Sequence, residues 1–392
     1  MKSAGPTLAD SPLREDVFYL ILLALVWTKD IPVAYARALL LRLPVLESIA
    51  DPVLWLLYLA MVLLSVPYFL KRLSIEDVAF YLGVAAVYLL SLLRGDAIRE
   101  YLQSQAVPLL MQTVPLYFLG KALEPERHLP LLGRLSLLTV YLRFAYTVLT
   151  NGGTGSYLDG HMSASYKLLP HVCLVVYCAI ENRSVVYVLG SLLGAMLLLS
   201  FGTRGPMVLL VIFVLSFLLM IRKYRRPLRS RLMVLAGMGV AIVLFRGVLP
   251  WLKGWSSQLG MSTRIYDKLL DGSFFQSEGR AELRRLLWEA SWSGPLWGYG
   301  MAGDRLLTGT YAHNLPVELL ISYGPIFGTL LFGALIWLLV RAFRKCESRQ
   351  GKTLVLLLTC TSLLKLFLSG TYLNEGWLFF LMGLCAATRR TA

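Results

Sequence analysis

Apolar residues recur along this chain in blocks of about 17 to 25, and each block is long enough to cross the roughly 30 Å hydrocarbon core of a bilayer as a helix. Hydrophobic residues make up 57% of the 392 positions, whereas charged residues make up only 16%. These proportions exclude a water-soluble globular domain and also a disordered chain. The sequence therefore predicts an all-α, polytopic integral membrane protein.

Twelve windows qualify as transmembrane helices, so residues 1–392 are predicted to form a single transmembrane domain. The windows are 15–29, 52–70, 77–93, 103–121, 129–149, 166–182, 184–200, 206–221, 232–250, 314–340, 353–369 and 373–388. The first window follows Arg14, Glu15 and Asp16, and no small-residue cleavage site comes after it. We therefore interpret it as a spanning helix and not as a removed signal peptide.

Lysine and arginine are unevenly distributed among the connections between these windows. If the N-terminus is inside, they concentrate in the connections that would be cytoplasmic, most densely at 222–231 and 341–352. Because positive residues stay in the cytoplasm during insertion, both termini are expected to be cytoplasmic. The net charge of +15 then reflects orientation and attraction to the anionic lipid of the bilayer, and no nucleic-acid partner is expected.

Metal-dependent and nucleotide-dependent chemistry finds little support in the sequence. The five cysteines show no CxxC spacing, which argues against a zinc site and against a disulfide frame. There is no Walker-type loop, HExxH motif or GxSxG motif, and no cluster of carboxylates on the outward side. We therefore expect neither a metal ion nor a cofactor.

One connection, residues 251–313, is too long to be a simple link and is rich in Gly, Trp, Arg and Ser. The predicted topology makes it an extracytoplasmic loop. Loops of this length are usually functional or disordered, and the many aromatic residues argue against disorder. We predict that this loop contains short helices and the catalytic site.

A short helix is predicted inside the loop, with Ser277 as its cap. Arg280, Arg284, Leu287 and Trp288 recur at helical spacing on one side of it. Two interpretations stay open. The helix could lie on the outer leaflet with its arginines on lipid phosphates, or Arg280 and Arg284 could hold a di-anionic group.

The segment Tyr311-Ala312-His313-Asn314 precedes the tenth window. Asn314 is a suitable cap and Pro316 fits the first turn, which places His313 at a helix N-terminus. The positive end of the helix dipole disfavours imidazolium, so a neutral His313 could accept a proton. The alternative is a structural, hydrogen-bonding histidine. Glu318 could orient His313 or be a neutral structural group.

Two further arginines are candidates for binding an anion. Arg204 lies in Gly202-Thr203-Arg204-Gly205-Pro206, which separates the seventh and eighth windows on the outward side. An arginine at such a depth is costly without a partner, so it indicates an anionic headgroup or ligand. Snorkelling to lipid phosphates is the alternative. Arg264 is open to the same two interpretations.

Taken in order, these motifs resemble those of the O-antigen polymerase and ligase superfamily of bacterial membrane glycosyltransferases. The resemblance covers about 200 to 340 and rests on the break at 202–206, Ser277-Glu278-Gly279-Arg280 with Trp288, Pro295-Leu296-Trp297-Gly298-Tyr299-Gly300, and Tyr311-Ala312-His313-Asn314 with Glu318, Leu319, Gly324 and Gly328. The stretch 157–166 resembles the segment before a mid-chain span in capsule and exopolysaccharide polymerases.

The resemblance implies a metal-independent enzyme of the bacterial cytoplasmic membrane whose substrate is an undecaprenyl-pyrophosphate-linked glycan. It implies that Arg204 and Arg280 hold the pyrophosphate and that His313 assists the acceptor hydroxyl. The further substrate-binding residues it implies are Arg264, Arg284, Tyr311 and Glu318. Chain-length regulator proteins are a further candidate partner.

Several functions remain compatible with these features. The stretch 157–166 favours a polymerase over a ligase that transfers the glycan to lipid A core or another acceptor. A permease or flippase would also hold pyrophosphate, but transporters commonly show internal repeats, and the long loop has no counterpart in the first half. A membrane scaffold would not need arginines that require anionic partners.

Overall fold

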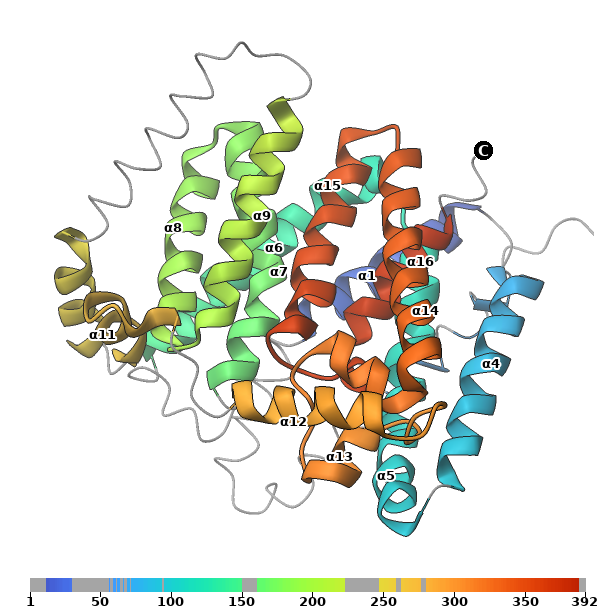
Figure 1. Cartoon of the computed structure of the whole chain (residues 1–392). Helices are drawn as coiled ribbons and strands as arrows, with labels where there is room; N and C mark the ends of the chain where they lie inside the picture. Colours follow the sequence, from blue (N-terminus) through green and yellow to red (C-terminus); the bar gives the residue numbers. More distant parts are fainter. Residues whose placement is uncertain are drawn as a thin grey trace, which may run out of the picture.

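The computed structural model describes residues 12–29, 72–93, 95–149, 161–222, 247–258, 262–275 and 280–387, together with isolated positions between 56 and 70. The regular structure in these ranges is helical (Figure 1). The longer helices are α1 (Pro12–Thr28), α4 (Ile75–Leu92), α5 (Asp96–Lys121), α6 (Pro125–Leu149), α7 (His161–Asn182), α8 (Val185–Ser200), α9 (Arg204–Arg222), α12 (Arg280–Ser293), α14 (Leu315–Lys345), α15 (Arg349–Leu358) and α16 (Gly376–Ala387). The short ones are α11 (Arg264–Leu270), η2 (Ser273–Phe275), α13 (Gly303–Thr308), η3 (Thr359–Leu363), η4 (Leu364–Phe367) and η5 (Tyr372–Asn374).

The helices lie where spans were predicted, apart from the windows 52–70 and 232–250, which fall largely outside the described residues. By length and apolar composition, four described helices are able to cross a membrane. They are Ile75–Leu92, Pro125–Val148, Ser163–Asn182 and Leu315–Lys345. The total of twelve spans therefore stays a prediction. The window 353–369 is not one continuous α-helix, since α15 passes into the π-helical η3 and then into η4.

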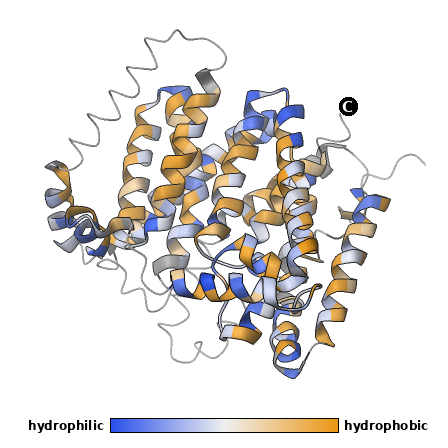
Figure 2. Cartoon of the chain, viewed as in Figure 1, coloured by the Kyte–Doolittle hydropathy of each residue, from blue (hydrophilic) through white to orange (hydrophobic). Residues whose placement is uncertain are grey.

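Hydrophilic residues gather at the two ends of the upright helices and in α12, whereas the middle of the helices is hydrophobic (Figure 2). At one end, the backbone N–H of Met301 donates to the Ser91 hydroxyl at 2.9 Å. At the other end, Asp77 and Lys121 form a buried ion pair. The predicted topology puts the loop that contains Met301 outside and the connection that begins at Lys121 in the cytoplasm. Which end faces the cytoplasm stays a prediction.

Close contact between α5 and α16 depends on two glycines. A Cβ on Gly120 would collide with the Phe380 carbonyl, and a Cβ on Gly383 would collide with the Tyr117 carbonyl. Small residues let helix backbones approach closely, which is how transmembrane helices gain packing energy without a hydrophobic driving force between them.

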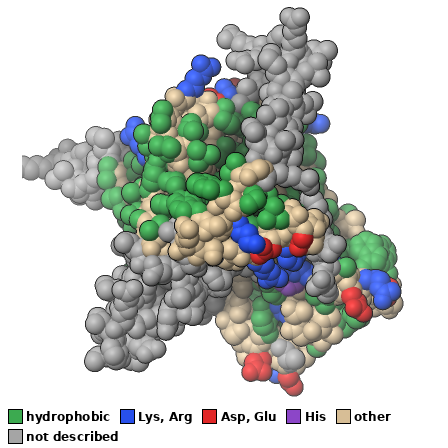
Figure 3. Space-filling view, turned by 90° about the vertical axis from the view of Figure 1, so that its left-hand side faces the viewer, with side chains coloured by type: hydrophobic (Ala, Val, Ile, Leu, Met, Phe, Trp, Pro, Cys, Tyr) green, Lys and Arg blue, Asp and Glu red, His purple; other side chains and the backbone are tan. Residues whose placement is uncertain are grey.

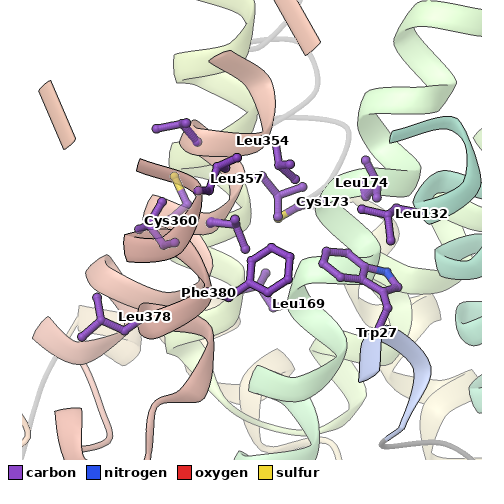
Figure 4. Close-up of a cluster of buried hydrophobic side chains, with 14 of the residues drawn as sticks. Trp27, Leu132, Leu169, Cys173, Leu174, Leu354, Leu357, Cys360, Leu378 and Phe380 are labelled. Atoms are coloured by element: carbon purple, nitrogen blue, oxygen red, sulfur yellow. The ribbon is translucent and has the colours of Figure 1, made fainter. Parts of the chain in front are cut away.

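The core between α1, α6, α7, α15 and α16 is filled by buried aromatic and aliphatic side chains (Figure 4). Trp27 is 1% exposed and lies in this core with Leu132, Leu169 and Phe380. The Trp27 indole N–H donates to the Ser136 hydroxyl at 2.8 Å, so its polar atom is satisfied. This core holds the helices in place. At one end they carry a polar layer, which consists of residues 280–314 and 368–371.

A break in α14 connects the membrane helices to that layer. Gly324 has a φ of 78° inside α14, and Pro325 follows it. A proline has no N–H to donate to the carbonyl four residues earlier, so helix carbonyls are left open at this point. The N–H groups of Tyr299 and Gly300 donate to the carbonyls of Ile321 and Ser322, at 2.8 and 2.9 Å. The turn after α12 is thereby attached to α14.

Candidate active site

Helix α12 lies across the ends of the upright helices (Figure 1). Leu287 is 0% exposed and packs in one cluster with Val317 and Ile321 of α14. Arg280 and Arg284 are half-buried, while Trp288 is 47% exposed. The predicted helix is therefore confirmed, and on its predicted common side Trp288 is more exposed than the other three residues. The predicted cap, Ser277, lies outside the described residues.

The segment before α14 holds His313 in an unusual backbone conformation. Its φ is 53°, in the left-handed region that costs most residues of order 1–3 kcal/mol. The Asn314 side chain accepts from the backbone N–H of Val317 at 3.3 Å, which confirms the predicted cap. The N–H of Ala312 donates to Asp304 Oδ2 at 2.7 Å and ties the segment to α13.

The His313 imidazole is neutral at ordinary pH. Burial lowers its pKa to about 4, and the positive charges of Arg280, Arg284 and Arg305 lower it further in the same direction. The prediction of a neutral ring is thus supported. The cause differs from the predicted one: burial and the arginines lower the pKa of His313, whereas the sequence suggested the dipole of the following helix. The Tyr311 ring lies 3.9 Å from the His313 ring, centroid to centroid. His313 Nδ1 is buried and has no hydrogen-bond partner among the described residues.

Arg280 and Arg284 come together at the start of α12. Arg284 Nε donates to the Arg280 carbonyl at 3.2 Å. Arg280 Nη1 donates to the Leu368 carbonyl at 3.0 Å, in the connection between η4 and η5. Lysine and arginine side chains gather low on the face shown in Figure 3, beside a histidine and a few acidic groups. The structure therefore brings Arg280, Arg284 and Tyr311 to His313.

Glu318 is not hydrogen-bonded to His313. It is 0% exposed, and Arg305 Nη1 lies 3.4 Å from its Oε1. The Thr371 hydroxyl and the backbone N–H of Tyr372 also donate to its carboxylate. Of the two predicted roles for Glu318, this geometry favours the structural one, because its oxygens are already engaged within the protein.

Arg305 was missed by the sequence analysis. Its Nη1 pairs with Asp304 Oδ1 at 2.6 Å, and its guanidinium carbon lies 4.9 and 5.5 Å from the ring centroids of Tyr101 and Tyr311. Proximity to two carboxylates raises the pKa of Arg305, so it remains charged even though burial opposes the charge. The argument used for Arg204, that an arginine near apolar segments needs a partner, could have identified it.

Arg204 and Arg264 form a neighbouring group. Arg204 Nη1 donates to the carbonyls of Phe274 and Ser273, at 2.5 and 3.4 Å. Arg264 starts α11 with an exposed side chain, and its Cβ would lie 3.7 Å from a Cβ built on Gly202. Both arginines therefore border the Gly202 break.

Tyr166 of α7 links the two groups. Its hydroxyl occupies the place that a Cβ on Gly205 would take, next to Arg204 in the chain. It also interacts electrostatically with Arg280 and Tyr311. The first four residues of the predicted stretch 157–166 lie outside the described residues, and its end forms the start of α7.

The connection between η4 and η5 is a second element that the sequence analysis missed, because it falls between two predicted spans. Lys365 and Glu375 pair across it, and Lys365 lies 5.5 Å from the Tyr166 ring centroid. Within the part of the chain that the structure describes, no group of three or more His, Cys, Asp or Glu residues could hold a metal ion. Arginine and lysine are the cations of this layer.

The fold and this layer define a helical membrane protein with arginines and a neutral histidine collected at one end. Residues 189–333 match a family model described as O-antigen ligase, and this match supports the resemblance of the chain to the O-antigen polymerase and ligase superfamily. The matched region contains Arg204, Arg280 and His313. Members of the family are glycosyltransferase-like enzymes of bacterial membranes. No match was found among curated proteins or among solved structures.

Proposed function

We propose that this chain is a glycosyltransferase that polymerises undecaprenyl-pyrophosphate-linked oligosaccharide repeats on the outer side of the cytoplasmic membrane. The product would be an O-antigen, a capsular polysaccharide or an exopolysaccharide. The observation that carries the proposal is the neutral His313 ring beside Arg280 and Arg284, within the region that matches the family. An imidazole that stays unprotonated next to fixed positive charge suits a base beside an anionic leaving group.

In the proposed reaction, a sugar hydroxyl of one lipid-linked chain attacks the anomeric carbon of another. A new C–O bond forms at that carbon while its bond to the pyrophosphate oxygen breaks. His313 takes the proton of the hydroxyl, and the carrier lipid leaves with its pyrophosphate. Base assistance of this kind is typically worth about 10² to 10⁴ in rate.

The arginines are proposed to stabilise the leaving group. Guanidinium groups match phosphate oxygens in geometry and keep their charge, so they can neutralise the charge that develops as the bond breaks. We assign this role to Arg280 and Arg204, with Arg284 and Arg264 as additional contacts. Tyr311 would border the acceptor, because its ring contacts the ring of His313. Glu318 would support the site through Arg305.

A ligase that transfers the finished glycan to lipid A core or another acceptor is the second candidate. The observation that favours it is the description of the matching family model, which is O-antigen ligase. The chemistry at the anomeric carbon would be the same, and only the acceptor would differ. Chain-length regulator proteins are proposed partners of the polymerase alone.

The experiment uses cells that lack the native protein and express variants at matched levels. We choose His313→Asn because asparagine tolerates the left-handed backbone at this position and cannot serve as a base, together with Arg280→Ala. The matched control is Arg285→Ala, since Arg285 is an exposed arginine of the same helix and pairs only weakly, at 3.8 Å, with Glu289.

The glycolipid profile distinguishes the candidates. Accumulation of single lipid-linked repeats in His313→Asn and Arg280→Ala cells supports the polymerase. Long chains that remain on the carrier lipid support the ligase. Full-length polysaccharide in cells with normally inserted His313→Asn protein would contradict both.

A further inference from the structure

Three ionisable side chains form a buried network close to the segment that carries His313. Asp304 and Glu318 are both 0% exposed, and Arg305, whose side chain is 11% exposed, lies between them. The network connects α13, α14 and the start of η5, because Glu318 also accepts from the Thr371 hydroxyl. A buried charge network is costly to assemble and is weak evidence for stability alone, so its position beside the candidate base calls for an explanation.

Two contacts transmit this network to the segment that carries His313. Asp304 uses one carboxylate oxygen for Arg305 and the other for the backbone N–H of Ala312. The guanidinium of Arg305 lies against the ring of Tyr311, and that ring contacts the His313 ring at a tilted angle. The two residues that precede His313 are thus held in place, Ala312 through its backbone N–H and Tyr311 through its ring.

The backbone at His313 needs such support. A φ of 53° is unfavourable for histidine, and conformations of this kind persist only where the surroundings over-determine them. The next residue, Asn314, caps α14 and fixes the far side of the loop. Before His313, the contact of Asp304 with the Ala312 N–H and the contact of Arg305 with the Tyr311 ring fix the loop.

We propose that Asp304 and Arg305 are positioning residues for His313: they hold the loop 311–313 so that the imidazole meets the acceptor hydroxyl. This inference rests on the proposed base role of His313. It assigns a role to two residues that carry none in the proposed chemistry.

The charged groups that act on His313 come from two helices. Arg280 and Arg284 belong to α12, and Arg305 belongs to α13. Removing one of them removes part of the field that disfavours imidazolium. The ring should therefore protonate at higher pH in Arg305→Gln than in the wild-type protein, in the direction of the ordinary imidazole value of about 6.5.

The first experiment reads His313 without an activity assay. Purified protein is treated with diethylpyrocarbonate between pH 3 and 8, and modification of the peptide that contains His313 is followed by mass spectrometry. Only the neutral ring reacts, so the pH midpoint of the rate reports its protonation. We expect a midpoint that rises in Arg305→Gln, stays near the wild-type value in Arg305→Lys, and does not change in Arg285→Gln.

The second experiment separates charge from geometry in a reconstituted assay with a lipid-linked repeat. Arg305→Lys keeps the positive charge but lacks the planar guanidinium that lies between the rings of Tyr101 and Tyr311. It should lower kcat by about 10²-fold through misplacement, with little change in KM. Asp304→Asn removes the ion pair with Arg305 and should lower kcat similarly.

The outcomes are distinguishable from failure of the proposed function. If His313→Asn is inactive while Arg305→Gln keeps the wild-type midpoint and kcat, the positioning role is wrong and the base role stands. If His313→Asn retains full activity, the base role is wrong whatever Arg305 does. If Arg305→Gln only lowers the unfolding temperature, with the midpoint and kcat unchanged at permissive temperature, Arg305 is structural and the inference is overturned.

Discussion

Gly298 and Gly324 lie backbone against backbone, so that a Cβ on Gly298 would come within 2.6 Å of the Ser322 carbonyl oxygen. Both residues have positive φ, at 69° and 78°, which glycine adopts without steric cost. The turn 295–300 thereby docks onto the break in α14, and through it α12 is placed over the helix ends. The glycines of the two motifs are needed for this one contact.

Alanine at Gly298 or Gly324 should therefore disrupt the layer. A Cβ would have to push apart two backbones, and alanine at positive φ adds strain. We expect loss of glycan synthesis and faster proteolysis within 280–313. Gly333→Ala is the control, because Gly333 lies in the same helix with no atom near its Cβ position. Normal synthesis in Gly324→Ala cells would show that the docking is dispensable.

The pH dependence of the reaction follows from the pKa of His313. Because that pKa is lowered to about 4, the ring is neutral and able to accept a proton throughout the neutral range. Initial rates of kcat/KM should therefore be flat down to about pH 5 and fall below the pKa by about tenfold per pH unit. Recovery of activity on return to pH 7 controls for denaturation. An acidic limb centred near 6.5 would mean that burial and the arginines do not act on the ring.

Leu287 and Trp288 are adjacent but should differ sharply in their effect on stability. Leu287 is 0% exposed between α12 and α14, so Leu287→Ala should lower the free energy of unfolding by about 2–5 kcal/mol. Trp288 is 47% exposed, and Trp288→Ala should cost much less. Thermal unfolding of both variants in the same detergent measures the difference. Equal losses of stability in the two variants would contradict the placement of α12, in which Leu287 is buried and Trp288 is exposed.

The proposed chemistry relies on arginine and not on a metal ion. Treatment with a strong chelator should therefore leave the rate of polymerisation unchanged in the reconstituted assay. Supplementation with Mg²⁺ or Mn²⁺ after chelation should add nothing. A rate that collapses with chelator and returns with one of these ions would require a metal site that the proposal does not contain.

The helices could largely be predicted from the sequence, because a bilayer imposes a minimum apolar length that is visible in the windows. The cap at Asn314 and the helix beginning at Arg280 were also predictable, since both depend on local sequence. The division of the window 353–369 was not, because the leucines on both sides of η3 make the whole window resemble one span.

The site was predicted in part for a similar reason. Arg280, Arg284 and His313 belong to the one long loop that the sequence predicted to contain the site, so their motifs pointed to one place. Arg305 and Thr371 become neighbours of Glu318 only through the packing of α13 and the η4–η5 connection on α14. Such long-range juxtaposition leaves no periodicity in the sequence.

The left-handed backbone at His313 means that the residue best for stability and the residue best for the proposed reaction differ at this position. Glycine is the residue that this φ of 53° suits best, so His313→Gly should be more stable than His313→Ala by about 1 kcal/mol. Both would lack the imidazole and its reaction. Histidine at position 313 therefore lowers the stability of the fold relative to glycine while it supplies the imidazole. Selection for folding alone would not favour histidine at this position.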